Sequence, residues 1–127
     1  MAGTKGEKYY NVFLKYKIWL VSREEENILG DGKVNLLKEI DKQGSLQSAV
    51  NTIGISYRKA WGNLKKAEEI LGFSLVEKHR GGQFGGTTTL TDEGRNLIEA
   101  YEELHKEIDE TIKKTVKKFF NHINDFK

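Results

Sequence analysis

The sequence predicts a mainly helical domain with a small amount of β structure, and three observations support this prediction. Apolar residues recur at helical spacing in two segments that meet at Gly54. A glycine-rich segment, 80–86, then separates two short stretches that are rich in strand-forming residues. A long helical pattern opens at Thr91 and continues almost to the end of the chain. Helix, turn, helix, hairpin and helix in this order are what a winged helix-turn-helix requires.

Length and composition permit this fold and exclude several kinds of chemistry. The 127 residues are enough for one domain with a real core. The chain contains no cysteine, and its three histidines do not form a spaced ligand set, so we expect no disulfide, no metal site and no thiol nucleophile. Because no apolar run is long enough for a membrane span or a signal peptide, we expect a cytoplasmic protein that does not bind a membrane.

The acidic residues give no support for catalysis. They cluster on the last helix among lysines, in pairs four residues apart such as Glu102 with Lys106 and Asp109 with Lys113. Pairs of this kind form a solvated face rather than an active site. We therefore predict no catalytic residue, no cofactor and no enzymatic activity.

The first part of the chain predicts a strand followed by a helix. Residues 1–8 are expected to be disordered, and 9–127 are expected to form a single domain. Apolar and polar side chains alternate from Asn11 to Val21, which predicts a strand with one buried face. The charged segment 22–32 ends in a Gly-Asp-Gly turn signal, and helical spacing of apolar residues over 33–42 then predicts the first helix.

Serine and glycine residues mark the ends of the next two helices. Ser45 caps a short second helix that ends at Gly54, and Ser56 caps a third helix. The inward positions of the third helix are Ala60, Leu64, Ala67 and Leu71. Trp61, at the edge of this stripe, is assigned to the core because aromatic residues at such positions are more often packing groups than base-stacking groups.

The exposed face of the third helix is the main candidate for a nucleic-acid contact. The net charge of +2 is small, but the segment 56–80 holds six lysines and arginines against three glutamates. A helix in this position can enter the major groove, where Arg58 can pair with guanine and Asn63 with adenine, while Lys66 lies nearer to phosphates. The complete set of candidate DNA-binding residues is Ser45, Gln47, Ser56, Arg58, Lys59, Gly62, Asn63, Lys66, Lys78, His79, Arg80 and Gln83.

A hairpin and a long helix complete the predicted fold. Strands are expected over 74–79 and 87–90, and the helix over about 91–124. A helix of about 30 residues extends roughly 45 Å, which is further than a small helix-turn-helix core can cover. Because soluble monomers rarely expose a large apolar patch, we expect a homodimer. The predicted dimerisation residues are Val12, Leu14, Ile18, Leu104, Ile108, Ile112, Val116, Phe119 and Ile123.

The segments that carry these patterns resemble a known family. Gly54-Ile-Ser-Tyr-Arg-Lys-Ala-Trp61, with Gly44-Ser45 before it and Leu90-Thr-Asp-Glu-Gly94 after the glycine-rich segment, is similar to the N-terminal DNA-binding domain of ModE-type molybdate-responsive transcription regulators. The similarity extends over about 15–101. A looser resemblance, to the LysR-type helix-turn-helix pattern, is carried by Ala60, Leu64, Glu68, Leu71-Gly72, Leu75 and Leu90-Thr91. The similarity to the ModE-type domain implies a winged helix that dimerises through the N-terminal strand region and the long helix, and that regulates operons for molybdate uptake or molybdenum enzymes.

The resemblance also sets an expectation for ligands and partners. In full-length ModE proteins molybdate binds C-terminal domains, and no such domain follows the last helix in these 127 residues. We therefore expect double-stranded DNA and a second copy of the chain as partners, and no tight molybdate binding. The alternative is a protein–protein interaction module that keeps the fold and uses the third helix or the hairpin against another protein. A steep salt dependence of DNA binding would distinguish the two.

Overall fold

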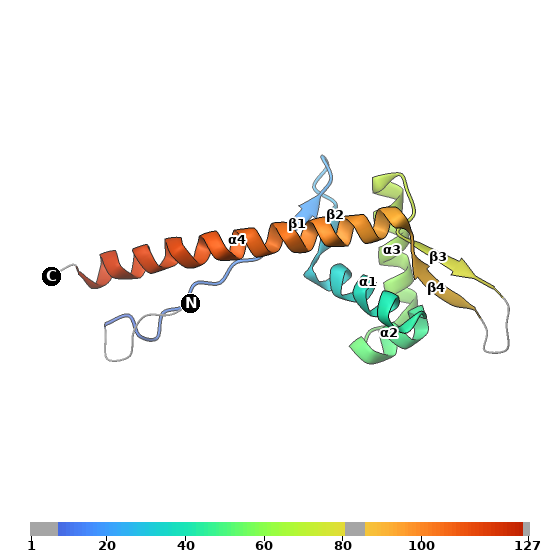
Figure 1. The fold of residues 1–127 in the computed structure, drawn as a ribbon, viewed down its shortest axis with the longest axis horizontal. Helices are drawn as coiled ribbons and strands as arrows, with labels where there is room; N and C mark the ends of the chain where they lie inside the picture. Colours follow the sequence, from blue (N-terminus) through green and yellow to red (C-terminus); the bar gives the residue numbers. More distant parts are fainter. Residues whose placement is uncertain (1–7, 81–85, 126–127) are drawn as a thin grey trace. The chain divides into compact units, whose positions relative to one another are not determined.

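The computed structural model describes residues 8–80 and 86–125 of the chain. Within these residues there are four helices and two small antiparallel hairpins (Figure 1), which confirms the prediction of a mainly helical fold with a long last helix. In chain order the elements are β1 (Trp19–Val21), β2 (Asn27–Gly30), α1 (Asp31–Gln43), α2 (Leu46–Ile53), α3 (Tyr57–Leu71), β3 (Val76–His79), β4 (Thr87–Leu90) and α4 (Asp92–Asn124). The chain divides into two compact units, one made of Ile18–Ala100 and the other of the residues on either side of that range.

Serine caps and glycines set the helix ends in the unit Ile18–Ala100, as the sequence predicts. The Ser45 hydroxyl accepts a hydrogen bond from the Ser48 amide at 3.2 Å, and the Ser56 hydroxyl accepts one from the Lys59 amide at 3.3 Å. Left-handed glycines with φ between 70° and 86° follow the first three helices: Gly44, Gly54 and Gly72. Residues with a side chain rarely adopt this conformation, so each helix ends where its glycine stands.

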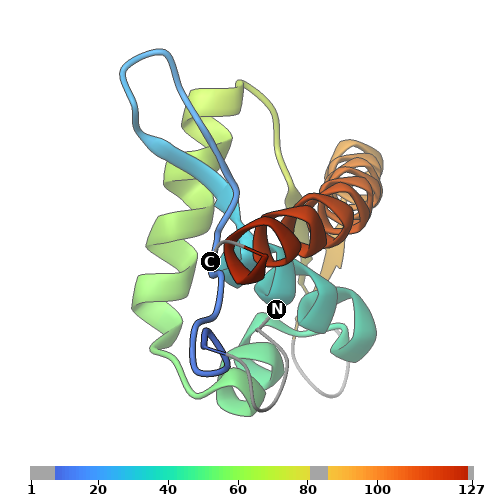
Figure 2. The same cartoon turned by 90° about the vertical axis from the view of Figure 1, so that its left-hand side faces the viewer.

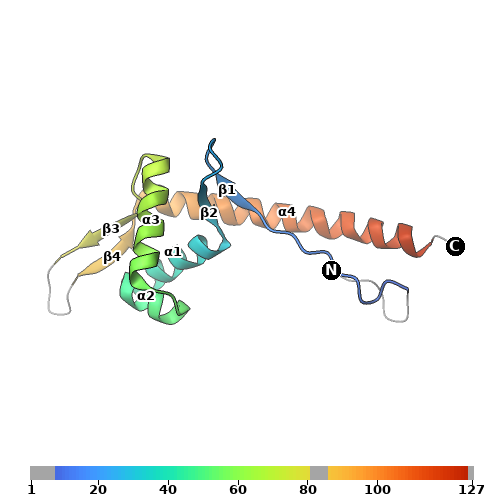
Figure 3. The same cartoon turned by 180° about the vertical axis from the view of Figure 1, so that it is seen from behind.

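The core of this unit takes side chains from β2, from the first three helices and from the segment before β3. The largest side chains that are fully buried are Leu29, Leu37, Ile40, Leu46, Val50, Leu64 and Leu75. Burying a side chain of this size stabilises a fold by about 1.5–3 kcal/mol, so this cluster holds α1, α2 and α3 together. Figure 3 shows α2 at the N-terminal end of α3, and the β3–β4 hairpin extending away from the helices.

Hydrogen bonds attach the β3–β4 hairpin to the helices. The buried Glu68 carboxylate of α3 accepts hydrogen bonds from the amides of Leu75 and Val76 at 2.6 and 3.2 Å. In β4, the Thr88 amide donates to the Gly44 carbonyl at 2.9 Å. The hairpin is therefore fixed both to α3 and to the end of α1.

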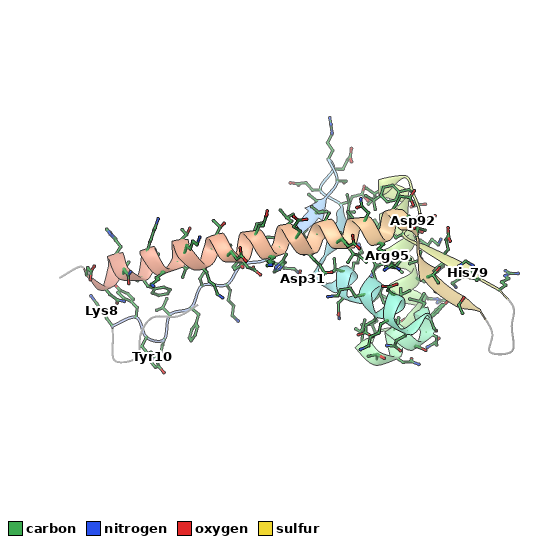
Figure 4. The ribbon with its side chains drawn as sticks, in the orientation of Figure 1. Lys8, Tyr10, Asp31, His79, Asp92 and Arg95 are labelled. Carbon is green, nitrogen blue, oxygen red and sulfur yellow. The ribbon has the colours of Figure 1, made fainter. Side chains whose placement is uncertain are left out.

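The first turn of α4 lies against the backbone just before β3. The Thr91 amide donates to the Leu75 carbonyl at 2.9 Å, and the Thr91 hydroxyl accepts from the Gly94 amide at 2.9 Å. A Cβ atom at Gly94 would lie 2.3 Å from the Leu75 carbonyl oxygen, so this close approach requires glycine. The guanidinium of Arg95 (Figure 4) donates to both carboxylate oxygens of Asp41 in α1 at 2.9 and 2.7 Å, which lowers the pKa of Asp41. The first turn of α4 is thereby fixed to α1 and to the backbone just before β3.

The N-terminal strand is much shorter than the sequence predicts. Of the expected strand over 11–21, Trp19–Val21 pairs with β2, which lies in the charged segment 22–32, where no strand was predicted. Residues 14–18 form no strand, and Val12 and Leu14 are 44% and 43% exposed. Alternating hydrophobicity produces a strand only where a second strand supplies hydrogen bonds, and β2 is only 4 residues long. The prediction of one strand with one buried face over the whole segment is therefore wrong within this chain.

The second compact unit combines the N-terminal segment with the distal part of α4. Residues 8–17 run beside this part of the helix (Figure 1), and the Tyr16 hydroxyl donates a hydrogen bond to the Asp109 carboxylate. The carboxylate of Asp109 also lies 2.9 Å from Nδ1 of His105. The hydrogen bond from Tyr16 and the contact with His105 lower the pKa of Asp109.

The buried side of α4 includes one residue that was not predicted. Phe120, which was not among the predicted dimerisation residues, is 6% exposed, as is Val116, whereas Phe119 is 54% exposed. Positions 109, 116 and 120 lie on the same side of a helix, so the side that contacts Tyr16 is also the side that is buried. Leu104 and Phe119 remain at the surface. No helix in the described part of the chain is both long enough and apolar enough to cross a membrane.

Candidate nucleic-acid interface

α3 separates a buried face from an exposed polar one. Ala60, Leu64 and Ala67 are at most 1% exposed and face the core. The predicted contacts on this helix are all exposed: Arg58, Lys59, Gly62, Asn63 and Lys66. This division follows from the spacing of the apolar residues. The structure therefore brings this part of the predicted site together along one helix.

The two serines and the glutamine of the predicted site have local hydrogen-bond partners. Ser45 and Ser56 cap α2 and α3, and the Gln47 side chain on α2 donates to the Asn51 side chain at 3.0 Å. A serine hydroxyl that accepts from an amide still has its own hydrogen to donate. Capping therefore leaves both serines able to contact an anion.

Lys66 faces the β1–β2 hairpin, which runs beside the C-terminal half of α3 (Figure 2). Its ammonium group lies 3.7 Å from the Glu26 carboxylate near the hairpin tip. Lys33, at the start of α1, donates to the Ile28 carbonyl at 3.0 Å. Burial lowers the pKa of Lys33, and the nearby charge of Lys66 lowers it further. The contact with Glu26 thus partly neutralises the charge of Lys66 within the chain itself.

The stem of the β3–β4 hairpin presents three exposed side chains of the predicted site, Lys78, His79 and Arg80. The His79 ring (Figure 4) lies with Nε2 3.0 Å from the Thr89 hydroxyl of β4. A Cβ atom at Gly86 would lie 2.7 Å from the His79 carbonyl oxygen, so the strands approach closely only because this residue is glycine. Gln83 lies outside the described residues.

Tyr57 and Trp61 connect the first turns of α3 to the hairpin stem. The Lys78 ammonium group donates to the Tyr57 hydroxyl at 2.5 Å and lies 4.1 Å from the centroid of the Trp61 ring. The Lys65 ammonium group lies 4.4 Å from the same centroid. Trp61 is half-buried with two cations beside its ring, so its assignment to the core is wrong. Tyr57 was not among the predicted contacts, although a tyrosine next to exposed cations is a signal for one.

The exposed groups of this surface are cations and hydrogen-bond donors, which suit an anionic partner. No cluster of three or more His, Asp or Glu side chains that could hold a metal ion occurs in residues 8–80 and 86–125. The arrangement can therefore neutralise negative charge and donate hydrogen bonds, and the groups that are available for this come from α3 and from the hairpin stem.

Comparison with known proteins gives one consistent result. No protein-family model matches the chain. The DNA-binding transcriptional dual regulator ModE of Escherichia coli is 32% identical over 90 residues, which are 70% of this chain and 34% of that protein. The chain is homologous to the ModE transcriptional regulators.

Two further relatives match a somewhat shorter part of the chain. The ModE regulator of Haemophilus influenzae is 36% identical over 74 residues, which are 58% of this chain and 29% of that protein. The molybdenum transport protein ModE of Azotobacter vinelandii is 34% identical over 79 residues, which are 62% of this chain and 29% of that protein. The chain thus spans about a third of the length of these curated ModE relatives, in their N-terminal portion. The resemblance that the sequence indicates is confirmed.

Proposed function

We propose that this ModE homologue is a winged helix-turn-helix that binds double-stranded DNA and regulates transcription without catalysing a reaction. In this proposal α2 and α3 form the helix-turn-helix, α3 is the recognition helix, and the β3–β4 hairpin is the wing. The observation that supports it most is the exposed cationic side of α3, which the hydrogen bond from Lys78 to Tyr57 connects to the wing stem. The relative that is named a DNA-binding regulator points to the same function.

Arg58 and Asn63 are the side chains that we propose for reading bases. Arg58 lies in the first turn of α3 and forms no ion pair with any described residue. The major groove is about 12 Å wide and admits a helix, and a guanidinium group can donate two hydrogen bonds to guanine there. Asn63 is exposed on the same helix and suits adenine. Arg80, at the wing stem, is better placed for phosphates.

We further propose that the regulator is a homodimer that acts in the cytoplasm on genes for molybdate transport or molybdenum enzymes. Val12, Leu14, Leu104 and Phe119 are between 42% and 54% exposed within one compact unit. A second copy of the chain would remove this apolar surface from water. Val116 is already buried within the chain, so we expect it to contribute less to the dimer.

Binding to duplex DNA at several salt concentrations tests this proposal, with the preferred site obtained by selection from random sequences. We expect the logarithm of the binding constant to fall against that of the salt concentration with a slope of about −0.9 for each phosphate contact. Arg80→Ala should reduce the slope by about 0.9. Lys114→Ala, which removes an exposed lysine of distal α4, is the matched control and should leave the slope unchanged.

The selected sites also test the dimer. Two half-sites related by a dyad, about one helical turn or a multiple of it apart, are expected for two recognition helices. Selected sites without a dyad would contradict the dimer. If no duplex binds with a salt-dependent affinity, the regulator proposal is overturned, and a protein–protein interaction module explains the surface better.

A further inference from the structure

The charge of Lys78 has a different environment from that of Lys65, although both ammonium groups lie beside the Trp61 ring. The Lys65 ammonium group is paired with the Glu68 carboxylate at 3.1 Å. Lys78 has no carboxylate partner within residues 8–80 and 86–125, and donates instead to the Tyr57 hydroxyl, which is uncharged at neutral pH. Two ammonium groups at one ring repel each other, and only one of them is neutralised. The charge of Lys78 therefore suits an anion from outside the chain.

The Tyr57 hydroxyl supplies the second group of the same site. Its oxygen accepts from Lys78, so its own hydrogen is directed elsewhere and can be donated to a ligand. A hydroxyl that accepts from an ammonium group is polarised, which makes it a stronger donor. Tyr57 is the first residue of α3, directly after the Ser56 cap, so this donor lies where the recognition helix meets the wing stem.

We propose that Tyr57 and Lys78 together bind one phosphodiester group of the DNA backbone, with the Trp61 ring beside the ammonium group. This inference rests on the proposed function and adds a defined phosphate site to it. A phosphodiester has two unesterified oxygens, so one can accept from the Tyr57 hydroxyl and the other from the Lys78 ammonium group.

The position of Lys78 gives this site a role beyond charge. A lysine is usually a mobile point charge on a flexible chain. Here the contact with Trp61 and the hydrogen bond to Tyr57 fix where the ammonium group stands, even though the side chain is exposed. Phosphate contacts with fixed geometry set the register of a protein on the duplex. The site therefore positions the recognition helix rather than reading a base.

Two substitutions separate the hydroxyl from the charge. Tyr57→Phe keeps the ring and removes the donor, and it should weaken binding about tenfold with no change in the salt slope. Lys78→Met keeps a chain of similar length and removes the charge, so it should weaken binding about tenfold and reduce the salt slope by about 0.9. Tyr10→Phe changes an exposed tyrosine of the other compact unit and is the matched control. It should alter neither quantity.

Single methylphosphonates in the selected DNA site identify the phosphate that is bound. A methylphosphonate has no charge and one acceptor fewer, so the wild-type protein should lose about tenfold in affinity at the phosphate that this site contacts. Tyr57→Phe and Lys78→Met have already lost part of this contact, so a methylphosphonate at that same phosphate should lower their affinity little further. At every other phosphate the two variants should be as sensitive to the replacement as the wild-type protein. If both variants lose their sensitivity at the same phosphate, both residues contact that phosphate. A merely structural role for either residue would not produce this result.

The outcomes distinguish this inference from the function on which it rests. If the wild-type protein binds DNA and both variants keep full sensitivity at every phosphate, the inference is overturned and the proposed function stands. If the wild-type protein binds no duplex with salt-dependent affinity, both are overturned. Urea unfolding of each variant checks that it is folded, and Lys78→Gln replaces Lys78→Met in the same assay if the methionine variant is unstable.

Discussion

The two ends of α3 carry the same number of cations but differ in how that charge is used. In the first turn, Arg58 and Lys59 form no ion pair within the described residues. Further along, Lys65 and Lys66 lie 3.1 and 3.7 Å from carboxylates of α3 itself and of the β1–β2 hairpin. A cation that already contacts a carboxylate gains less from a phosphate, because the first contact must be weakened. The N-terminal end of α3 therefore has the more available charge.

A count of basic residues therefore does not locate an interface by itself. The segment 56–80 is basic as a whole, and its sequence gives no reason to rank Lys66 below Arg58 by charge. The ranking comes from Glu26, which belongs to a hairpin far away in the sequence. A lysine that is paired with a carboxylate of the same chain has less charge available for nucleic acid than the local sequence indicates.

Removing Glu68 should have the largest effect, because this carboxylate anchors the C-terminal end of α3. Glu68→Ala takes away the acceptor of two backbone amides, those of Leu75 and Val76, together with the partner of Lys65. We expect the free energy of unfolding to fall by about 3 kcal/mol, since each unsatisfied buried amide costs about 1–3 kcal/mol. Urea denaturation measures this. Glu69→Ala, at the exposed neighbouring position, should cost less than about 0.5 kcal/mol, and equal losses for the two variants would contradict the anchor role.

Arg58→Ala should have the next largest effect and acts on the available end of α3. On the selected DNA site we expect a loss of about 1–3 kcal/mol and a relaxed preference at one base pair, because a guanidinium group is lost from the base edges. Fluorescence anisotropy with the selected site and with a scrambled duplex measures both quantities. Lys65→Ala, at the paired end, is the matched control and should cost less. If the two variants lose the same affinity, the charge at the N-terminal end of α3 is not more available to DNA than the paired charge of Lys65.

Glu26→Gln should have the smallest effect and should make the two ends more alike. The substitution removes the carboxylate charge beside Lys66, so DNA affinity should rise, by less than about fivefold because the ion pair is exposed. The salt slope should become steeper by at most about 0.9. Glu24→Gln, on the same hairpin, is the control for a general loss of negative charge. An affinity that rises equally in both variants would show that the contact with Lys66 is not the cause.

Local signals predicted most of the helical part of the fold. Ser45 and Ser56 cap α2 and α3, and Gly54 ends α2, because these preferences depend only on the backbone within one turn. β2 could not be predicted in the same way. Asn27–Gly30 follows a run of charged residues, and it is a strand only because Trp19–Val21 pairs with it. A pairing of this kind is set by the partner and not by the segment itself.

The candidate site shows the same limit. The exposed side of α3 follows from helical spacing, and Trp61 with Lys65 is a pair four residues apart that the sequence displays directly. Lys78 reaches Trp61 and Tyr57 from β3, and no local rule brings these residues together. For this reason the sequence placed Trp61 in the core and did not include Tyr57 among the predicted contacts, although it did include Lys78. The predicted DNA contacts themselves stay predictions until binding is measured.

The backbone of Leu75 joins two helices that are far apart in the sequence. Its amide donates to Glu68 of α3, and its carbonyl accepts from the Thr91 amide at the start of α4. Gly94 closes over the same carbonyl, where no larger residue fits. The Leu75 backbone thus links the C-terminal part of α3 to the start of α4 through hydrogen bonds on both of its sides. A substitution that displaces this backbone would therefore disturb the attachment of both helices at once.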